Sequence, residues 1–158
     1  MTAYLNIGSN IGDRMAHIER AVAAVMALSA DGKARVSAPF ESEPWGFDSS
    51  NLFINVGVAI EIPEQMTPHM LLSRLLETQR SLCDAAHRAP DGSYIDREID
   101  IDLIAVDSLV IDTPELTLPH PRMHLRDFVL RPMAEIAPHW RHPVSGLTCA
   151  ELADRLRP

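Results

Sequence analysis

The residues best placed to do chemistry lie in the segment 99–103, which reads Ile-Asp-Ile-Asp-Leu. Its apolar residues alternate with period two, which predicts a core strand that carries Asp100 and Asp102 side by side on its other face. Neighbouring carboxylates repel each other unless a cation lies between them, and hard oxygen ligands suit Mg²⁺. The pair is therefore a candidate Mg²⁺ site with Arg97 beside it, although an Asp-x-Asp pair alone does not establish one. The alternative is a solvated strand face on which Arg97 only neutralises the carboxylates.

A second polar segment, residues 118–130, combines two prolines, two histidines and two arginines ahead of an apolar helix expected from about Asp127. Imidazolium and guanidinium groups contact phosphate, and a helix N-terminus favours anions. His120, Arg122 and Arg126 are therefore candidates for an anion site. The alternative is a surface loop of solvated charge.

The clearest strand runs from Leu52 to Ile62, and its even-numbered residues are expected to face the core. This places Phe53 and Asn55 as neighbours on the other face. An aromatic ring can stack on a flat heterocycle, while a carboxamide can pair with its donor and acceptor edge. The alternative is an exposed aromatic that packs under the loop at Trp45, with Asn55 bonded to backbone.

The elements that would position these residues are short and separated by turn signals. Thr67-Pro68 has the pattern of an N-cap followed by proline at the first helical position, and Thr148 with Glu151 forms a capping-box pattern. A hairpin is expected after the Asp-x-Asp strand, with its turn at 107–108. The expected strands are 3–7, 35–40, 52–62, a strand from 99 and a returning strand at 109–111, and the expected helices are 13–28, 67–83, one from about 127 and one from about 148.

Composition predicts a single domain over residues 1–158, because 158 residues with 46% apolar content fill one core but not two ordinary ones. The net charge of −8 argues against a nucleic-acid or anionic-membrane partner. The two cysteines lack metal-site spacing, and no apolar run reaches eighteen residues. We expect reduced thiols and a soluble, cytoplasmic protein.

Several short motifs occur in a consistent order and at compatible spacing. Together they closely resemble the 6-hydroxymethyl-7,8-dihydropterin pyrophosphokinase family, from about Ala3 to Pro138. Any one of the motifs is weak evidence, but their order is specific. The motifs are Tyr-Leu-Asn-Ile-Gly-Ser-Asn at 4–10, Glu-Pro-Trp-Gly at 43–46, Phe53-x-Asn55, Asp96-Arg97-x-Ile99-Asp100-Ile101-Asp102-Leu103, Leu118-Pro119-His120-Pro121-Arg122 and Arg126-x-Phe128-Val129-Leu130.

The resemblance implies an α+β fold with a ferredoxin-like, largely antiparallel sheet and helices packed on it. It also implies transfer of pyrophosphate from ATP to the hydroxymethyl group of the pterin, yielding AMP, as a step of folate biosynthesis. Asp100 and Asp102 match the ligands of two Mg²⁺ ions that bind with ATP. The implied partners are ATP and 6-hydroxymethyl-7,8-dihydropterin, in a chain that is a monomer or at most a weak homodimer.

The same resemblance assigns roles residue by residue. Phe53 and Phe128 match the two rings that sandwich the pterin, Asn55 reads the pterin edge, and Tyr94 stands where the family usually has Trp. The full pterin set is Ser42, Pro44, Trp45, Gly46, Phe53, Asn55, Tyr94 and Phe128. The nucleotide and phosphate set is Leu103, Thr117, His120, Arg122 and Arg126, and Arg97 joins Asp100 and Asp102 as a catalytic residue.

One segment departs from the family pattern. The family commonly has Leu-Gly-Arg-x-Arg after the second long helix, whereas this chain reads Leu-Cys-Asp-Ala-Ala-His-Arg at 82–88. The match places Asp84 where an arginine is expected, and Arg88 is the candidate to take its catalytic place. Losing one guanidinium that stabilises the transition state predicts a slow enzyme with an intact binding site.

This departure keeps alternatives open. One is a catalytically weak or inactive paralogue that binds pterin or nucleotide, and another is a metal-dependent phosphodiesterase that uses the same carboxylates. A P-loop kinase is excluded in its usual form, because the chain has no G-x-x-x-x-G-K-[ST] motif.

Overall fold

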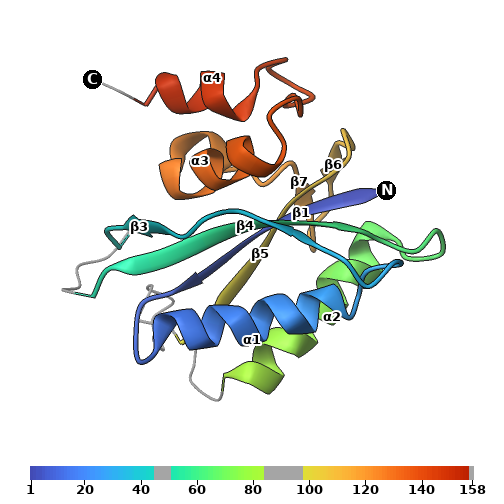
Figure 1. The fold of residues 1–158 in the computed structure, drawn as a ribbon. Helices are drawn as coiled ribbons and strands as arrows, with labels where there is room; N and C mark the ends of the chain where they lie inside the picture. Colours follow the sequence, from blue (N-terminus) through green and yellow to red (C-terminus); the bar gives the residue numbers. More distant parts are fainter. Residues whose placement is uncertain (45–50, 84–97, 157–158) are drawn as a thin grey trace.

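The computed structural model describes residues 1–44, 51–83 and 98–156, and a single antiparallel sheet forms its centre (Figure 1). The strand order is β2-β4-β1-β5, and β3 also pairs with β4. Each of these pairings is antiparallel. A smaller sheet pairs β6 with β7. The strands are β1 (Thr2–Ser9), β2 (Arg35–Val36), β3 (Phe40–Ser42), β4 (Phe53–Glu61), β5 (Asp100–Val106), β6 (Ile111–Asp112) and β7 (Thr117–Leu118).

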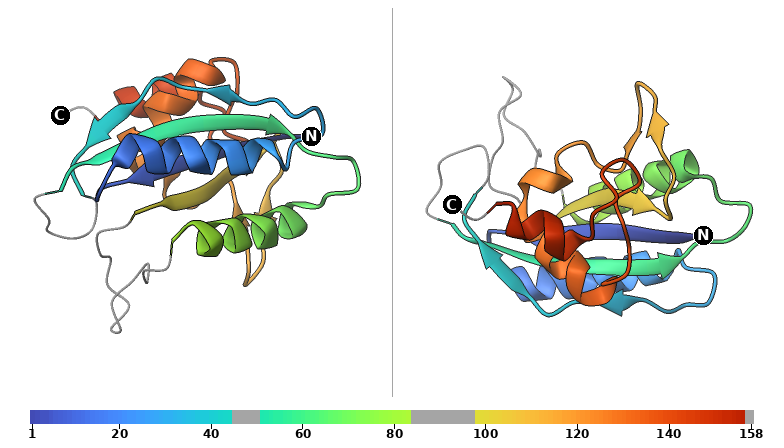
Figure 2. Two further views of the ribbon diagram at one scale, coloured as in Figure 1. Left: turned by 60° about the horizontal axis from the view of Figure 1, so that its bottom comes forward. Right: turned by 90° about the horizontal axis from the view of Figure 1, so that it is seen from above.

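Helices cover both faces of the main sheet, as Figures 1 and 2 show. Two helices lie on one face and two on the other, and three of the four begin at a side chain that caps a free backbone N–H. Asp13 accepts from Ala16 N at 3.1 Å, and Thr67 accepts from Met70 N at 3.1 Å. The helices are α1 (Arg14–Met26) and α2 (Pro68–Leu82) on one face, α3 (Asp127–Ile136) and α4 (Cys149–Asp154) on the other, and a 3₁₀ turn η1 (Met123–Leu125).

The order of elements confirms the expected ferredoxin-like α+β class. β1, α1 and the β2–β3 segment are followed by β4, α2 and β5, so two strand–helix–strand halves interleave in the sheet. The capping box predicted at Thr148 and Glu151 is also present and begins α4. Within the described residues, no helix is long and apolar enough to cross a membrane.

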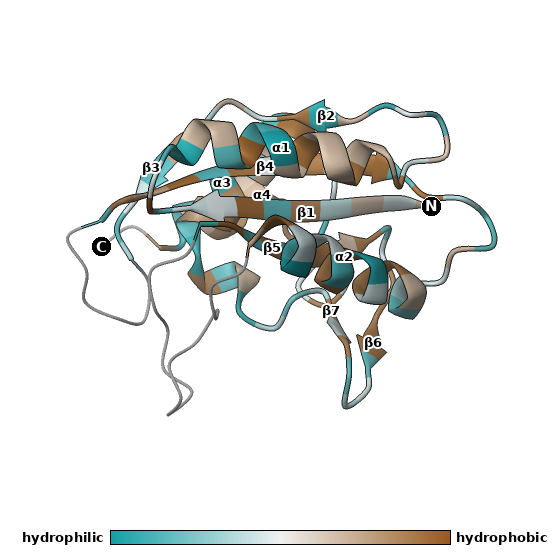
Figure 3. Cartoon of the chain, turned by 90° about the horizontal axis from the view of Figure 1, so that it is seen from below, coloured by the Kyte–Doolittle hydropathy of each residue, from teal (hydrophilic) through white to brown (hydrophobic). Residues whose placement is uncertain are grey.

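Because helices cover both faces, the molecule has two apolar cores. The core under α1 and α2 includes Ile7, Ile18 and Leu71. The core under α3 and α4 includes Leu130 and Met133. In Figure 3, hydrophilic segments lie on the outer surfaces of α1 and α2, as expected for helices that bury one side only. Cys83 and Cys149 are both buried, and no disulfide joins them in the described part of the chain, so the reduced thiols stay a prediction.

The expectation of one continuous strand over residues 35–40 is wrong. The segment forms two strands, because β2 ends at Val36 and β3 begins at Phe40. Between them the hydroxyl of Ser37 accepts the Gly57 N–H at 2.8 Å. The Ala38 N–H then donates to the Glu135 carboxylate of α3 at 3.1 Å. The Ser37 N–H still donates to the Gly57 carbonyl at 2.9 Å, so side chains add to the backbone bonding at this break, which residue pattern alone does not indicate.

Two further expectations are corrected. The returning strand at 109–111 does not pair with β5; the turn at 107–108 is present, but β6 pairs with β7 instead. In addition, β4 begins one residue after Leu52, whose side chain is 38% exposed rather than in the core. Helix α3 covers the other face of β4, so Phe53 and Asn55 are buried there.

Candidate functional site

The predicted carboxylates lie beside the central strand β1 at one end of the sheet. Gly8 pairs with Asp100 on one side and with Asn55 on the other, and Asn6 pairs with Asp102. Residues directly opposite each other in antiparallel strands point to the same face. The carboxylates, the Asn55 amide and Asn6 therefore share the face that α3 and α4 cover.

Gly8 leaves the middle of this row open. A Cβ atom at position 8 would lie 2.7 Å from Oδ1 of Asn55 and 3.5 Å from Cδ1 of Phe53. Both side chains therefore lean over the same glycine, which brings an aromatic ring and a carboxamide together as the sequence predicted. Asn55 is only 3% exposed, and its Nδ2 donates to the Ser42 hydroxyl at 3.0 Å. This bond fixes the amide with Oδ1 toward Gly8. The Nδ2 of Asn55 therefore bonds a side chain, whereas the alternative drawn from the sequence was a bond to backbone.

The predicted anion residues lie close to the same carboxylates. The His120 N–H donates to the Ile104 carbonyl of β5 at 2.7 Å, which attaches this loop to the strand of the two aspartates. Burial, with the positive charges of Arg126 and Arg122, lowers the pKa of His120 to about 4 against the opposing effect of the Asp100 charge. Arg126, Arg122 and Asp100 therefore each lie close enough to His120 to act on its charge.

The imidazole of His120 is neutral near pH 7, which corrects the expected imidazolium. Its Nδ1 accepts the N–H of Arg122 at 3.1 Å. A neutral ring nitrogen that accepts carries no hydrogen, so Nε2 bears the ring proton and is a donor. His120 can therefore contribute one oriented hydrogen bond to an anion, while the arginines contribute the charge.

Arg126 and Phe128 lie at the start of α3. Arg126 is 7% exposed, and its guanidinium carbon lies 5.7 Å from the centre of the Phe128 ring, within the range of a cation–π contact. The ring itself is half-buried. A cation for an anionic ligand and a ring for an aromatic one are therefore held by the same helical turn.

The carboxylates suit Mg²⁺ better than a metal that needs a complete protein cage. Among the described residues, no group of three or more His, Cys, Asp or Glu side chains could hold a metal ion. A structural zinc site needs four such ligands. Mg²⁺ is usually bound through one or two carboxylates and takes water and phosphate oxygens as its other ligands. Asp100 and Asp102 match that donor set.

The remaining predicted residues are distributed unevenly around this centre. The Leu103 side chain is buried in the α1–α2 core, so only its backbone is available to a nucleotide. Thr117 is exposed on β7, and Pro44 is half-buried after β3. The other five predicted positions lie outside the described residues: Trp45, Gly46, Arg88, Tyr94 and Arg97.

Two residues with clear structural roles at the site were not assigned one from the sequence. Gln79 of α2 accepts the Ile101 N–H at 2.7 Å, between the two aspartates on the edge strand β5. Asn6 donates from Nδ2 to the Phe128 carbonyl at 2.9 Å. The signal for Asn6 is a carboxamide within an otherwise apolar strand, whereas nothing near Gln79 in the sequence points to β5.

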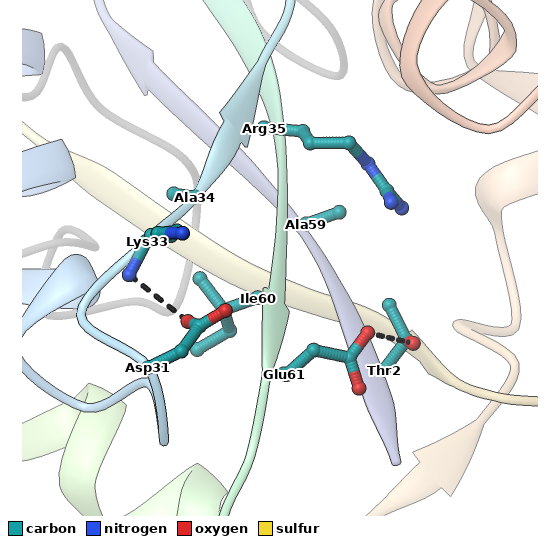
Figure 4. A pocket seen from close by; sticks show the side chains of 8 residues that line it. All are labelled: Thr2, Asp31, Lys33, Ala34, Arg35, Ala59, Ile60 and Glu61. Atoms are coloured by element: carbon teal, nitrogen blue, oxygen red, sulfur yellow. Dashed lines mark hydrogen bonds between the residues drawn. The ribbon is translucent and has the colours of Figure 1, made fainter.

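A surface pocket of about 250 Å³ lies at the opposite end of the sheet, where β1 begins and β4 ends (Figure 4). Its lining mixes both signs of charge, and the Thr2 hydroxyl donates to Glu61 within it. Because acidic and basic side chains both line the pocket, its charge favours neither an anionic nor a cationic ligand. The lining residues are Thr2, Asp31, Lys33, Ala34, Arg35, Ala59, Ile60 and Glu61.

Comparison with known proteins adds an independent finding. Residues 4–138 match the family model described as 7,8-dihydro-6-hydroxymethylpterin-pyrophosphokinase (HPPK). The chain is 38% identical over 142 residues to the 2-amino-4-hydroxy-6-hydroxymethyldihydropteridine pyrophosphokinase of Porphyromonas gingivalis, covering 89% of this chain and 92% of the relative. It is 36% identical over 156 residues to the protein of the same name from Methylorubrum extorquens, covering 99% and 94%.

Solved structures agree on the fold. The crystal structure of wild-type Plasmodium falciparum HPPK-DHPS superposes with a TM-score of 0.69 at 12% sequence identity. The match covers 98% of this chain but only 44% of that longer chain. At this identity the likeness supports the arrangement of sheet and helices alone.

Proposed function

The chain belongs to the 7,8-dihydro-6-hydroxymethylpterin-pyrophosphokinase family and is a pyrophosphokinase of folate biosynthesis, and from this premise we propose that it transfers pyrophosphate from Mg²⁺-bound ATP to the hydroxymethyl group of 6-hydroxymethyl-7,8-dihydropterin. In this reaction the pterin hydroxyl attacks the β-phosphorus, the bond between the α- and β-phosphates breaks, and AMP leaves.

The observation that carries the proposal is the row across β5, β1 and β4. Asp100, Gly8 and Asn55 are consecutive partners in this row. A carboxylate and an amide that can hydrogen-bond to the edge of a heterocycle therefore lie on one face of three adjacent strands. His120, on the loop before α3, lies close enough to both Asp100 and Arg126 for their charges to shift its pKa. The site thus combines groups for phosphate, for a divalent cation and for a flat polar ring.

Each described residue has a defined task in the proposed reaction. Phe53 stacks on the pterin and Asn55 pairs with its edge, while the Ser42 hydroxyl holds the Asn55 amide in place. The Arg126 guanidinium and Nε2–H of His120 donate hydrogen bonds to phosphate oxygens. Asp100 and Asp102 hold Mg²⁺, which when bound would neutralise charge on the phosphate chain.

Release of AMP from ATP and Mg²⁺ is the direct test, measured with and without 6-hydroxymethyl-7,8-dihydropterin. We expect AMP to form only when pterin is present. The Asp100→Ala/Asp102→Ala variant should lose this activity by a factor on the order of 10² or more, because charge stabilisation of the transition state is removed. The matched control is Glu19→Ala/Glu64→Ala, which removes two carboxylates that are both exposed and should retain activity.

Other outcomes would contradict the proposal in distinct ways. AMP release that does not need pterin would favour a phosphodiesterase. Binding of pterin without AMP release would show that the chain does not catalyse this transfer. The low rate expected from Asp84 stays a prediction, because residues 84–97 lie outside the described part of the chain.

A further inference from the structure

Helix α3 contains a proline where its first turn needs a donor. In an α-helix each carbonyl accepts the N–H four residues later. The residue four positions after Phe128 is Pro132, which has no N–H. The regular helical bond to the Phe128 carbonyl is therefore missing, and a part-buried carbonyl left unsatisfied would be costly.

Asn6 of the central strand supplies that bond. Its Nδ2 donates to the Phe128 carbonyl at 2.9 Å, and the asparagine is only 4% exposed. A carboxamide in the middle of a buried strand needs a partner, and a helical carbonyl freed by proline is a suitable one. The two sequence irregularities, a polar residue in β1 and a proline in α3, therefore satisfy each other.

A second contact fixes the same helix on the same row of the sheet. Gly57 of β4 is the pairing partner of Asn6. A Cβ atom on Gly57 would lie 3.1 Å from the carbonyl carbon of Pro132 and 3.2 Å from its Cβ, so the proline rests directly on the glycine. Helix α3 is thus held at the Phe128 carbonyl by a hydrogen bond and one turn later by close packing.

We propose that Asn6 is a positioning residue of the pterin site, which holds the first turn of α3 through the Phe128 carbonyl so that the Phe128 ring stays on the ligand-binding face. The inference rests on the proposed function, since it concerns the same pterin site. Asn6 acts through the backbone of Phe128 and need not touch the substrate. Arg126, whose guanidinium lies 5.7 Å from the centre of that ring, begins the same turn.

The test measures pterin affinity by calorimetry and kcat and KM for pterin by AMP release. Asn6→Leu keeps the size of the side chain but removes the donor. It should weaken pterin binding about tenfold, as expected when a buried acceptor loses its partner. The loss should appear mainly in KM for pterin, because Asn6 bonds Phe128 itself, whereas Asp100, Asp102 and His120 lie outside the first turn of α3. Asn6→Ala is the second variant and should shift affinity in the same direction.

Rescue separates positioning from general destabilisation. Pro132→Ala returns an N–H to position 132, so the helix itself can bond the Phe128 carbonyl. In the Asn6→Leu background it should restore at least about half of the tenfold loss on a logarithmic scale, a non-additivity typical of coupled residues. Thr148→Ala removes the N-cap of α4 and should lower stability without changing pterin affinity.

Each outcome decides the question. Wild-type affinity in both Asn6 variants would overturn the positioning role, and so would a loss that Pro132→Ala does not reduce. If the wild type binds no pterin, the proposed function fails and this inference fails with it. If the wild type binds and reacts while the Asn6 variants behave identically, only the inference fails.

Discussion

Gly8 is the single residue on which the shape of the site depends most directly. It lies between Asp100 and Asn55 in the pairing of three strands, and its missing side chain is the space into which Asn55 and Phe53 lean. Any other residue would place a Cβ atom 2.7 Å from the Asn55 oxygen, closer than real Cβ contacts allow. The glycine is therefore required by the close approach of its neighbours.

We predict that Gly8→Ala weakens pterin binding about tenfold or more. The new Cβ would lie 2.7 Å from Oδ1 of Asn55, so the amide must leave the position that Ser42 gives it. KM for pterin and the calorimetric dissociation constant measure the effect. Ser9→Ala is the control, because Ser9 is the next residue of β1 and its side chain points to the opposite face. Unchanged affinity in Gly8→Ala would contradict the described arrangement of Asn55.

The neutral state of His120 gives a prediction for stability against pH. The folded pKa is about 4, against an ordinary value of 6.5, so between these values the unfolded chain takes up a proton that the folded chain does not. The contribution of His120 to stability is therefore complete above pH 6.5, falls as the pH is lowered, and levels off near pH 4. The total change is about 3 kcal/mol in the free energy of unfolding.

Urea unfolding of wild type and His120→Gln at several pH values measures this change. The variant has no group that titrates at position 120, so its stability relative to wild type should rise by about 3 kcal/mol between pH 7 and pH 4. At pH 7 to 8 the difference should be constant. A difference that does not vary with pH would mean that His120 titrates near its ordinary pKa.

At the scale of elements, α2 contributes to the carboxylate strand from the other face of the sheet. β5 is an edge strand, so amides on its outer side have no strand partner. Gln79 takes one of them, the Ile101 N–H, at 2.7 Å. This bond holds the backbone midway between Asp100 and Asp102, and it links the register of α2 to the spacing of the two carboxylates.

We predict that Gln79→Ala raises KM for Mg²⁺-ATP by roughly three- to tenfold and destabilises the fold by about 1 kcal/mol, because a part-buried N–H loses its acceptor. Steady-state kinetics at saturating pterin and thermal unfolding measure the two effects. Thr78→Ala is the matched control, since the Thr78 hydroxyl bonds only within α2, to the Arg74 carbonyl at 2.8 Å. Equal KM values in the two variants would show that Gln79 does not position the carboxylates.

The sequence predicts elements well where the pattern is local. Alternation located β5 with its aspartates on one face, and cap residues located the starts of α2 and α4. It failed where the deciding contact is distant: Glu135 of α3 completes the break between β2 and β3, and β6 pairs with β7 rather than returning along β5. The roles of Asn6 and Gln79 were missed for the same reason, because their partners are far away in the sequence.

At the scale of the whole molecule, the site joins segments that are remote in sequence. β1, β4, β5, the loop before α3 and the first turn of α3 all contribute groups, and together they span residues 6 to 128. The chain carries a net charge of −8, so the attraction for anionic phosphate must come from this local set of cations. A ligand that bridges these segments binds only the folded arrangement and should stabilise the entire domain.

We therefore predict that Mg²⁺-ATP and pterin each raise the melting temperature of the wild type. A ligand at about 100 times its dissociation constant adds about 2.7 kcal/mol of stability. For a domain of this size, that corresponds to a rise of roughly 5 to 10 °C. Removing Mg²⁺ with a chelator while ATP is present should cancel most of the nucleotide-dependent rise, because the carboxylates then face the phosphates without a cation between them.

Two variants test separately how the Mg²⁺-ATP half and the pterin half of the site contribute to the rise in melting temperature. Asp100→Ala/Asp102→Ala should lose the Mg²⁺-dependent part and keep the part due to pterin, whereas Gly8→Ala should lose the pterin part and keep the other. Thermal unfolding with each ligand alone measures both. A full Mg²⁺-ATP shift in the double variant would place the cation elsewhere. Loss of both shifts in both variants would instead mean that the two halves of the site form only together. A substitution at one end of the three paired strands would then disturb ligand binding at the other end.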